Sequence, residues 1–315
     1  MIENCSVIIP CYNSSIDLLK KNITEIIDNW KDSSIKLQII IVVDGDLKKN
    51  SEKFKEFYEL KNIFKKIILL KNKKRLGQQE TVLNGLDYCS SDIAVTIDDD
   101  AKYPVHNLCN LAKQLYESDY ECFIGKPESN KNNKIRQLGT NLIKIIFNHV
   151  YKKKNEKIYF SSFRLIKKEI YKNILKKNYL VPVISYQILE ESNEIRNFSY
   201  DKNLKQKSRY SAFDLVTFFI NMNIFYSHLF YKLFAYIGLF LSVFSLYLIA
   251  NYLFNYFFSV SQVQPGFTTT TLLLLLILQI FFYCFALVIK YLNYYINFFK
   301  NIHFNKTKTY EEIYK

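Results

Sequence analysis

The sequence predicts an α/β protein in which a mainly parallel sheet is covered by helices on both faces and followed by a C-terminal membrane-spanning helical hairpin. Two observations support this prediction. Short β-rich runs alternate with amphipathic helical stretches through residues 1–125, and the segment from Leu233 to Ile289 contains no Asp, Glu, Lys, Arg or His. The alternation is typical of parallel sheets, because parallel strands need a crossover connection. The uncharged segment is typical of membrane proteins.

Five short runs rich in β-branched and apolar residues are the expected strands of the sheet. They are "CSVII" (5–9), "LQIIIVV" (37–43), "KKIILL" (65–70), "DIAVTI" (92–97) and "YECFI" (120–124). The stretches between them have apolar residues at helical spacing. These expected helices are at 14–30, 51–62, 78–89 and 105–118.

Polar residues follow three of these strands, in "PCYNSS" (10–15), "DGD" (44–46) and "DDD" (98–100). Ligands of such sheets bind at the C-terminal ends of the strands, so these loops are the expected site. The Gly-rich phosphate motifs G-x-G-x-x-G and the Walker loop do not occur in the sequence. A divalent cation on Asp98 and Asp100 would supply a counter-charge, because Mg²⁺ prefers one or two carboxylates together with substrate phosphates. Taken alone, the three acids equally suit an exposed turn that caps the next helix.

The uncharged C-terminal segment divides into two expected membrane spans, about 233–258 and about 270–289, on either side of Pro265 and Gly266. Each has the roughly 20 apolar residues that a helix needs to cross a hydrocarbon core about 30 Å thick. Lysines and arginines flank the pair while the connecting loop is uncharged. Both ends are therefore expected in the cytoplasm, in a multi-pass protein of the inner (plasma) membrane. A buried helical pair in a soluble protein is the alternative.

The expected organisation is a cytoplasmic domain at 1–210, an amphipathic juxtamembrane helix at 211–232, the two spans within 233–289, and a basic cytoplasmic tail at 290–315. The stretch 135–154 is also amphipathic and fits either an interfacial helix or a helix packed on the domain. The excess of 43 Lys and Arg over 29 Asp and Glu fits a nucleic acid, an acidic membrane surface or a phosphorylated substrate. Six scattered cysteines without a C-x-x-C pair are expected to be reduced thiols.

Several motifs follow one another along the chain: "SVIIPCYNSS" (6–15), "IIIVVDGD" (39–46), "RLGQQETVLNGL" (75–86), "VTIDDDAKYP" (95–104), "SSFRLIKKEI" (161–170), "KSRYSAFDLV" (207–216) and the hairpin. With these motifs the sequence resembles the inverting family-2 glycosyltransferases of GT-A (Rossmann-like) fold. More narrowly, it resembles the polyisoprenyl-phosphate glycosyltransferases related to dolichol-phosphate mannose synthase.

The resemblance implies an enzyme of cell envelope polysaccharide biosynthesis that transfers a sugar from a nucleotide-diphosphate donor to a polyisoprenyl phosphate. Undecaprenyl phosphate is the expected acceptor in a bacterium. The resemblance further implies Mg²⁺ or Mn²⁺ as cofactor, the lipid bilayer as partner and no nucleic acid. Oligomers are common among relatives with this hairpin, and whether this chain forms a homo-oligomer stays open.

The resemblance assigns nucleotide-sugar binding to residues at the strand ends, namely Pro10, Tyr12, Asn13, Asp44, Gly77, Gln78 and Asp98. Asp98 and Asp100 match the outer positions of the family's D-x-D motif. Asp100 is the expected principal metal ligand, and Asp98 is expected to lie closer to the ribose of the nucleotide. Both belong to the expected catalytic set.

The resemblance assigns lipid-phosphate binding to Arg164, in the family's x-F-R strand, and to Lys207, Arg209, Tyr210 and Ser211. Arg164 and Arg209 complete the expected catalytic set, because a planar guanidinium suits bidentate contact with phosphate. Ion pairing with an acid such as Glu169 is the alternative role of Arg164. Anchoring at the membrane surface is the alternative role of Arg209.

Four positions depart from the family pattern. Ser14 replaces a glutamate, Val43 an aspartate and Lys102 a glutamine beside the metal. Ser162 replaces the aspartate that is a proposed catalytic base in some members. A phosphate monoester is largely dianionic at neutral pH, since its second pKa is near 6, so such an acceptor needs positioning more than proton removal.

Two alternative functions stay open. In the first, the same fold uses a glycolipid or polysaccharide acceptor; processive synthases of this fold carry a Q-x-x-R-W motif, whereas the only tryptophan here is Trp30. In the second, the chain is a catalytically inactive membrane-anchored partner protein, as the departures at Val43, Lys102 and Ser162 suggest.

Overall fold

The computed structural model describes residues 2–12, 15–45, 52–64, 67–99, 105–128, 159, 161–179, 182–200, 229–258, 266–301 and 309–313. The chain divides into two compact units. The sheet unit comprises Met1–Asn133, Lys153–Ser208 and Ile302–Lys315, and the helical unit comprises Lys134–Lys152 and Arg209–Asn301. The chain therefore passes from the sheet unit to the helical unit twice, and it returns to the sheet unit at Lys153 and again at Ile302.

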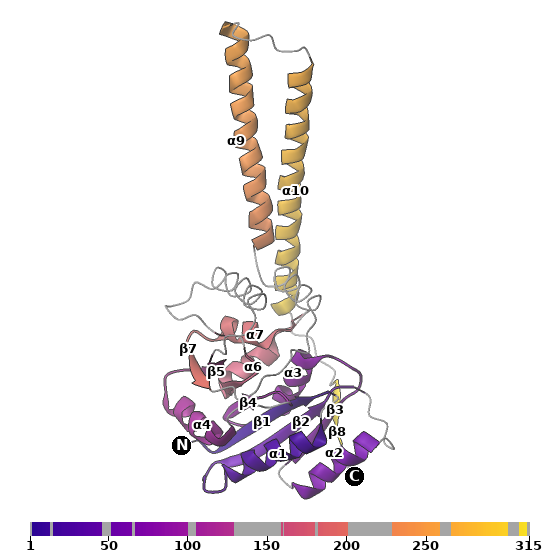
Figure 1. The fold of residues 1–315 in the computed structure, drawn as a ribbon, viewed down its shortest axis with the longest axis vertical. Coiled ribbons are helices and arrows are strands. Elements are labelled where there is room, and N and C mark those ends of the chain that lie inside the picture. The colour runs from indigo at the N-terminus through magenta and orange to yellow at the C-terminus, as the bar shows by residue number, and fades with distance from the viewer. Residues whose placement is uncertain are drawn as a thin grey trace. The chain divides into compact units, whose positions relative to one another are not determined.

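The sheet unit is built on one mixed sheet of eight strands in the order β7-β5-β6-β4-β1-β2-β3-β8 (Figure 1). The strands are β1 (Asn4–Cys11), β2 (Lys36–Val43), β3 (Ile67–Asn72), β4 (Ile93–Thr96), β5 (Cys122–Pro127), β6 (Arg164–Lys167), β7 (Ile195–Tyr200) and β8 (Tyr310–Glu312). β6 and β8 run antiparallel to their neighbours, whereas the other neighbouring strands are parallel. The predicted α/β fold is confirmed.

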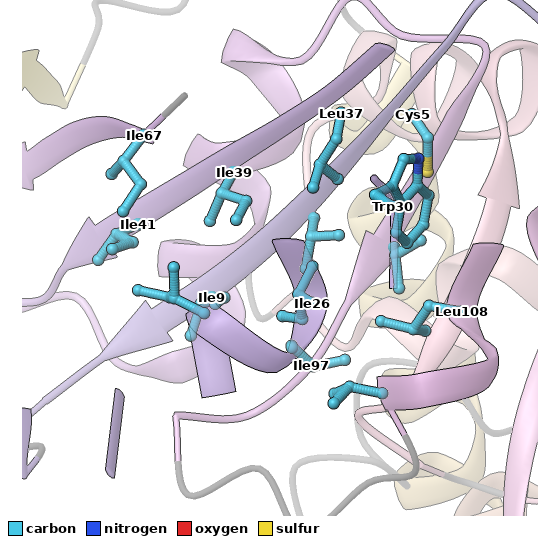
Figure 2. Packing of buried hydrophobic residues seen from close by; sticks show 14 of the residues in the cluster. Cys5, Ile9, Ile26, Trp30, Leu37, Ile39, Ile41, Ile67, Ile97 and Leu108 are labelled. Carbon is cyan, nitrogen blue, oxygen red and sulfur yellow. The ribbon is translucent and has the colours of Figure 1, made fainter. Parts of the chain in front are cut away.

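Helices cover both faces of this sheet. The side chains of Val7 and Ile9 in β1 pack with α1 (Ile16–Asp28), α2 (Glu52–Ile63) and α4 (Leu108–Glu117), and Figure 2 shows Ile9 beside Ile26 and Ile39 in this cluster. Because successive side chains of a strand point to opposite faces, Ile8 points to the other side. There it meets Gly85 of α3 (Gln78–Tyr88).

Two further helices follow the antiparallel strand β6. These are α6 (Lys168–Lys176) and α7 (Ile184–Glu191). Tyr171 of α6 is fully buried, and its hydroxyl donates to the carbonyl oxygen of Ser91 at 2.6 Å, just before β4 begins. α6 is thereby fixed to the same face of the sheet as α3, with which it is in contact.

Residues 309–313 form the edge of the sheet beside β3, a strand that the sequence analysis did not anticipate. Tyr310 pairs with Asn72, and Glu312 pairs with Leu70. The backbone N–H of Lys73 donates to the carbonyl oxygen of Thr309 at 2.9 Å. β8 therefore covers an edge of β3 that would otherwise present unpaired backbone groups.

The helical unit contains α9 (Leu229–Phe258) and α10 (Phe267–Asn301), which pack against each other. Tyr231–Phe258 and Thr269–Ile296 are long and apolar enough to cross a membrane. The contact between the helices uses small and polar side chains: Gly238 lies against the Tyr283 ring, and the hydroxyls of Ser242 and Tyr283 are 3.1 Å apart. Close approach at small residues is typical of helix packing in membranes.

The expected juxtamembrane helix at 211–232 lies outside the described residues except for 229–232, which begin α9. The amphipathic stretch 135–154 also lies outside them.

Gly85→Ala should destabilise the sheet unit by about 1–3 kcal/mol, because overpacking of a filled core has this cost. A Cβ at residue 85 would lie 2.5 Å from Cγ2 of Ile8, and this methyl is attached directly to the Ile8 Cβ and cannot swing away. In an unhindered helix the same change stabilises by about 1 kcal/mol, so the sign of the effect is informative. Chemical denaturation of the full chain in detergent measures it. In an Ile8→Ala background the cost should fall, and an equal cost in both backgrounds would contradict the contact.

Candidate functional site

Polar residues gather beyond the C-terminal ends of the central strands β1, β2 and β4, which lie along one side of the sheet. Tyr12 follows β1, Asp44 follows β2 and Asp98 lies just beyond β4. β6 runs antiparallel to β4 and begins opposite its end, with Arg164 paired to Thr96. Ser162, two residues before Arg164, therefore also lies near the C-terminal end of β4. This is the side of the sheet where ligands of such folds bind.

Pro10 ends the pairing between β1 and β4. Ile8 pairs with Thr96, and the N–H of Ile97 donates to the carbonyl oxygen of Ile8 at 3.1 Å. The next bond of a parallel ladder would need an N–H at residue 10, and proline has none. The buried Pro10 remains paired to Val42 of β2. The missing donor lets the chain after Ile97 separate from β1 and carry Asp98 away from the ladder.

Asp44 organises the loop before α3. Its carboxylate accepts hydrogen bonds from the backbone N–H of Leu76 at 2.8 Å, the backbone N–H of Gly77 at 2.9 Å and Nδ2 of Asn72 at 3.0 Å. The side chain is 7% exposed. Gly77 has a φ of 89°, a left-handed conformation that favours glycine. The carboxylate also lies at the N-terminal end of α3, where the helix dipole favours negative charge.

Asp98 is held by side chains from two other elements. Nε2 of Gln78, the first residue of α3, donates to Oδ1 of Asp98 at 2.5 Å. The Oγ hydroxyl of Ser162 donates to Oδ2 at 2.5 Å. The half-buried carboxylate is therefore oriented through both of its oxygens. Ser162, which stands where the resemblance expects an aspartate, thus donates a hydrogen bond to Asp98.

Arg164 is buried, with 5% of its surface exposed. Its guanidinium donates to Oγ of Ser185 from Nε at 3.2 Å and from Nη2 at 3.0 Å, and to Oγ1 of Thr96 from Nη1 at 3.4 Å. Oγ1 of Thr96 in turn donates to the carbonyl oxygen of Ser162 at 2.7 Å. These bonds fasten β4, β6 and α7 together. The role of Arg164 in phosphate binding remains a prediction.

Arg75 is a site residue to which the sequence analysis gave no role. Its guanidinium carbon lies 4.3 Å from the centre of the Tyr12 ring, a cation–π contact. Tyr12 is 41% exposed. The contact joins the loop after β1 to the loop before α3. Its only signal in the sequence was the position of Arg75 at the start of the motif "RLGQQETVLNGL".

Asn72, Thr81 and Asn84 are three further polar residues that sequence reasoning missed. All three are buried, and Nδ2 of Asn72 donates to Asp44 and, at 2.9 Å, to Oγ1 of Thr81. Nδ2 of Asn84 donates to Oδ1 of Asn72 at 2.8 Å. The available signal was the placement of an amide at the end of a strand and of two polar residues on the buried face of a helix.

The remaining predicted site residues lie outside the described part of the chain. They are Asn13, Asp100, Lys207, Arg209, Tyr210 and Ser211, as well as the departures Ser14 and Lys102. Within the described residues, no three His, Cys, Asp or Glu side chains gather as a metal-binding group. The half-buried carboxylate of Asp98 fits a divalent cation by its chemistry, since it offers two hard oxygen atoms whose orientation Gln78 and Ser162 fix. Hard oxygen ligands are those that Mg²⁺ prefers.

The model of glycosyl transferase family 2 matches residues 6–175, more than half of the chain. No curated protein matches the sequence.

Two groups of solved structures are similar to the chain. The mannosyltransferase PcManGT of Pyrobaculum calidifontis, solved with GDP-Man and Mn²⁺, is 16% identical with a TM-score of 0.47; the match covers 65% of this chain and 58% of that one. Glucosyl-3-phosphoglycerate synthase of Mycobacterium tuberculosis, solved with phosphoglyceric acid, is 13% identical with a TM-score of 0.48 and coverages of 65% and 73%. The chain thus spans less than two thirds of the length of the Pyrobaculum enzyme.

Tyr200, the last residue of β7, should make stability fall at high pH. Burial raises the pKa of Tyr200 to about 12; a hydrogen bond with Ser161 lowers this pKa and the negative charges of Tyr159 and Asp98 raise it. In the unfolded chain the tyrosine hydroxyl loses its proton near pH 10. The stabilising contribution of Tyr200 is therefore complete below about pH 10 and is lost as the pH rises towards 12. Melting temperatures of the full chain in detergent between pH 8 and 11.5 measure the decline.

Tyr200→Phe is the matched variant, because it keeps the edge contact of the ring with Phe163 at 5.6 Å between centroids. Its melting temperature should decline less steeply above pH 10 than that of the wild type. Parallel curves for the two proteins would contradict the assignment.

Proposed function

The chain belongs to glycosyl transferase family 2, and from that premise we propose that this glycosyltransferase moves a sugar, with inversion, from a nucleoside diphosphate donor to a polyisoprenyl phosphate at the cytoplasmic face of a membrane. The observation that carries the proposal is the ordered set of contacts around Asp98, in which Gln78 and Ser162 orient the carboxylate at the end of β4. Asp44 and the Leu76–Gly77 backbone support the neighbouring side of the same edge.

The connectivity of the chain supports a membrane hairpin. Residues of β1 and of β8 belong to one sheet, although α9 and α10 lie between them in the sequence. A sheet of this kind lies on one side of a membrane, so a chain that crosses the membrane after β7 has to cross back before β8. α9 and α10 are two helices apolar enough for these two crossings. The flanking lysines and arginines favour the cytoplasm for both ends.

The residues of the site would bind and orient the donor. Tyr12 and Arg75 form an exposed aromatic and cationic surface for the nucleotide, and the loop that Asp44 holds borders it. Asp98 and Asp100 would hold a divalent cation. When bound, this cation supplies positive charge against the diphosphate that leaves the sugar.

In the proposed reaction an oxygen of the acceptor phosphate forms a bond to the anomeric carbon of the sugar. The bond from that carbon to the donor diphosphate breaks, and its electron pair leaves with the nucleoside diphosphate. Attack opposite the leaving group inverts the configuration. The attacking oxygen carries no proton, because a phosphate monoester is mostly dianionic at neutral pH.

Ser162 favours a phosphate acceptor over a sugar hydroxyl. A hydroxyl nucleophile needs a general base within hydrogen-bond reach. A serine hydroxyl is a poor base at neutral pH, and the hydroxyl of Ser162 donates a hydrogen bond to Asp98. A phosphate nucleophile needs positioning instead, and Arg209 with Lys207 would supply it.

Transfer should depend on a divalent cation and on Asp100. The full chain in lipid nanodiscs is mixed with undecaprenyl phosphate and radiolabelled UDP- and GDP-sugars, and label is extracted into the organic phase. EDTA should abolish transfer, and Asp100→Ala should lower it about a hundredfold or more, because metal charge stabilisation is worth several kcal/mol. Asp119→Ala, which removes an exposed acid after α4, is the control and should have no effect.

Each other outcome of this assay has a distinct meaning. Full activity in Asp100→Ala would refute the metal assignment. Label on a glycolipid or polysaccharide alone would replace the proposed acceptor. Nucleotide binding without transfer to any of these acceptors would identify a membrane-anchored partner protein.

The rate should fall below about pH 6, where the acceptor phosphate gains its second proton. Ser162→Ala should lower kcat by about fivefold, because one hydrogen bond to Asp98 is lost, and leave this acidic limb unchanged. Steady-state rates from pH 5 to pH 9 measure both effects. Removal of the acidic limb by Ser162→Ala would show that Ser162 takes part in proton transfer, contrary to the proposal.

A further inference from the structure

A chain of hydrogen bonds connects the C-terminal strand to the loop at the donor side of the site. Oγ1 of Thr309 donates to Oδ1 of Asn84 at 3.1 Å, and Nδ2 of Asn84 donates to Oδ1 of Asn72 at 2.8 Å. Nδ2 of Asn72 then donates to Oδ1 of Asp44 at 3.0 Å. We call these four residues the relay. It ends where Asp44 accepts the N–H groups of Leu76 and Gly77.

The relay has one direction. Each asparagine accepts through its carbonyl oxygen and donates through its amide nitrogen, and the carboxylate of Asp44 can only accept, so Asp44 determines which group of Asn72, and in turn of Asn84, faces the next residue. If Asn84 turned over, its oxygen would face the oxygen of Asn72. If Asn72 turned over as well, its oxygen would face the carboxylate of Asp44. The carboxylate of Asp44 therefore opposes the reversed arrangement, and the hydroxyl of Thr309 completes the relay by donating to the carbonyl oxygen of Asn84 at the other end.

Burial makes the orientation of the relay consequential. Asn72 is 0% exposed, Asp44 is 7% exposed and Asn84 is 8% exposed. A buried amide without a partner is costly, and neighbouring bonds in such a chain strengthen one another. Thr81 adds to the constraint, because its only proton goes to the carbonyl oxygen of Gly77 at 2.7 Å, and it can then only accept from Asn72.

Thr309 is itself held in place by the sheet. Its carbonyl oxygen accepts the N–H of Lys73, and the following residue, Tyr310, pairs with Asn72 (Figure 1 shows β8 beside β3). The backbone therefore delivers the hydroxyl of Thr309 to Asn84 with little loss of side-chain freedom. In sequence, Thr309 is reached only after α9 and α10.

We propose that Thr309, Asn84 and Asn72 are positioning residues for the donor, and that the C-terminal strand is therefore part of the nucleotide-sugar site. They act through Asp44 on the backbone of Leu76 and Gly77. The next residue, Gln78, donates to Asp98. The relay thus connects the edge strand β8 to Asp44 at the end of β2 and, through the start of α3, to Asp98 beyond β4. This inference rests on the proposed function, since it assumes that a nucleoside diphosphate binds at this edge of the sheet.

The chain offers a matched pair of variants. Thr309→Val removes the hydroxyl that starts the relay but keeps the shape of the side chain. Tyr310→Phe removes a hydrogen bond of the neighbouring residue to the same helix, from the Tyr310 hydroxyl to Oδ2 of Asp87 at 2.7 Å. Both variants loosen the contact between the C-terminal strand and α3. Only Thr309→Val interrupts the relay.

The test uses the full chain in detergent and measures binding of UDP and GDP in the presence of Mn²⁺ by titration calorimetry. Thr309→Val should weaken the binding of the preferred nucleotide about fivefold, the effect of one net hydrogen bond. Tyr310→Phe should bind the nucleotide as the wild type does, although its melting temperature should decrease about as much as that of Thr309→Val. Thr309→Ser keeps the hydroxyl and should restore binding.

Steady-state kinetics separate positioning from a general loss of structure. Thr309→Val should raise the KM for the donor and leave both kcat and the KM for the lipid acceptor unchanged. Equal donor affinity in wild type and Thr309→Val, or equal weakening in Thr309→Val and Tyr310→Phe, would overturn the relay. Absence of nucleotide binding by the wild type itself would instead overturn the proposed function.

Discussion

The loop that leads into α3 depends on one buried carboxylate at the end of β2. Asp44 accepts two backbone N–H groups and one amide N–H, and these bonds fix the loop through which the chain enters α3. The entry of α3 determines where Gln78 lies, and Gln78 orients Asp98 at the end of β4. The ends of β2 and β4 are thereby connected through a helix rather than through direct contact.

The geometry of the central strands makes this connection possible. β1 pairs with both β2 and β4, and Pro10 ends its ladder with β4 for want of an N–H. On the face that α3 covers, Gly85 allows the helix to approach Ile8 closely. Pro10 lacks an N–H and so allows β4 to separate from β1 beyond Ile97. Gly85 lacks a side chain and so allows α3 to pack closely on β1.

The central strands and their helices follow from hydrophobic patterns that are legible in the sequence, because strands buried on both faces are continuous apolar runs. The motifs also led to the prediction that Asp44, Gln78 and Asp98 belong to the site, and the structure places Asp44 and Asp98 after β2 and β4 and Gln78 at the start of α3. The contacts of Ser162, Arg75 and Asn72 were not, since each joins residues distant in the sequence, as in the bond from Ser162 to Asp98. β8 was missed for a similar reason: its three residues carry no periodic signal, and pairing with β3 alone defines the strand.

β8 has two physical roles in one short segment. It covers the edge of β3 with backbone hydrogen bonds, and it brings Thr309 to the buried asparagines. A half-satisfied polar chain in a core is less stable than an apolar one, so the donor from Thr309, an exposed residue, contributes by satisfying the carbonyl oxygen of the buried Asn84. That donor follows α9 and α10 in the chain, and the sheet unit is therefore complete only after the hairpin has been synthesised and the chain has returned. The order of the sequence thus makes the completion of this sheet depend on the synthesis of both long apolar helices.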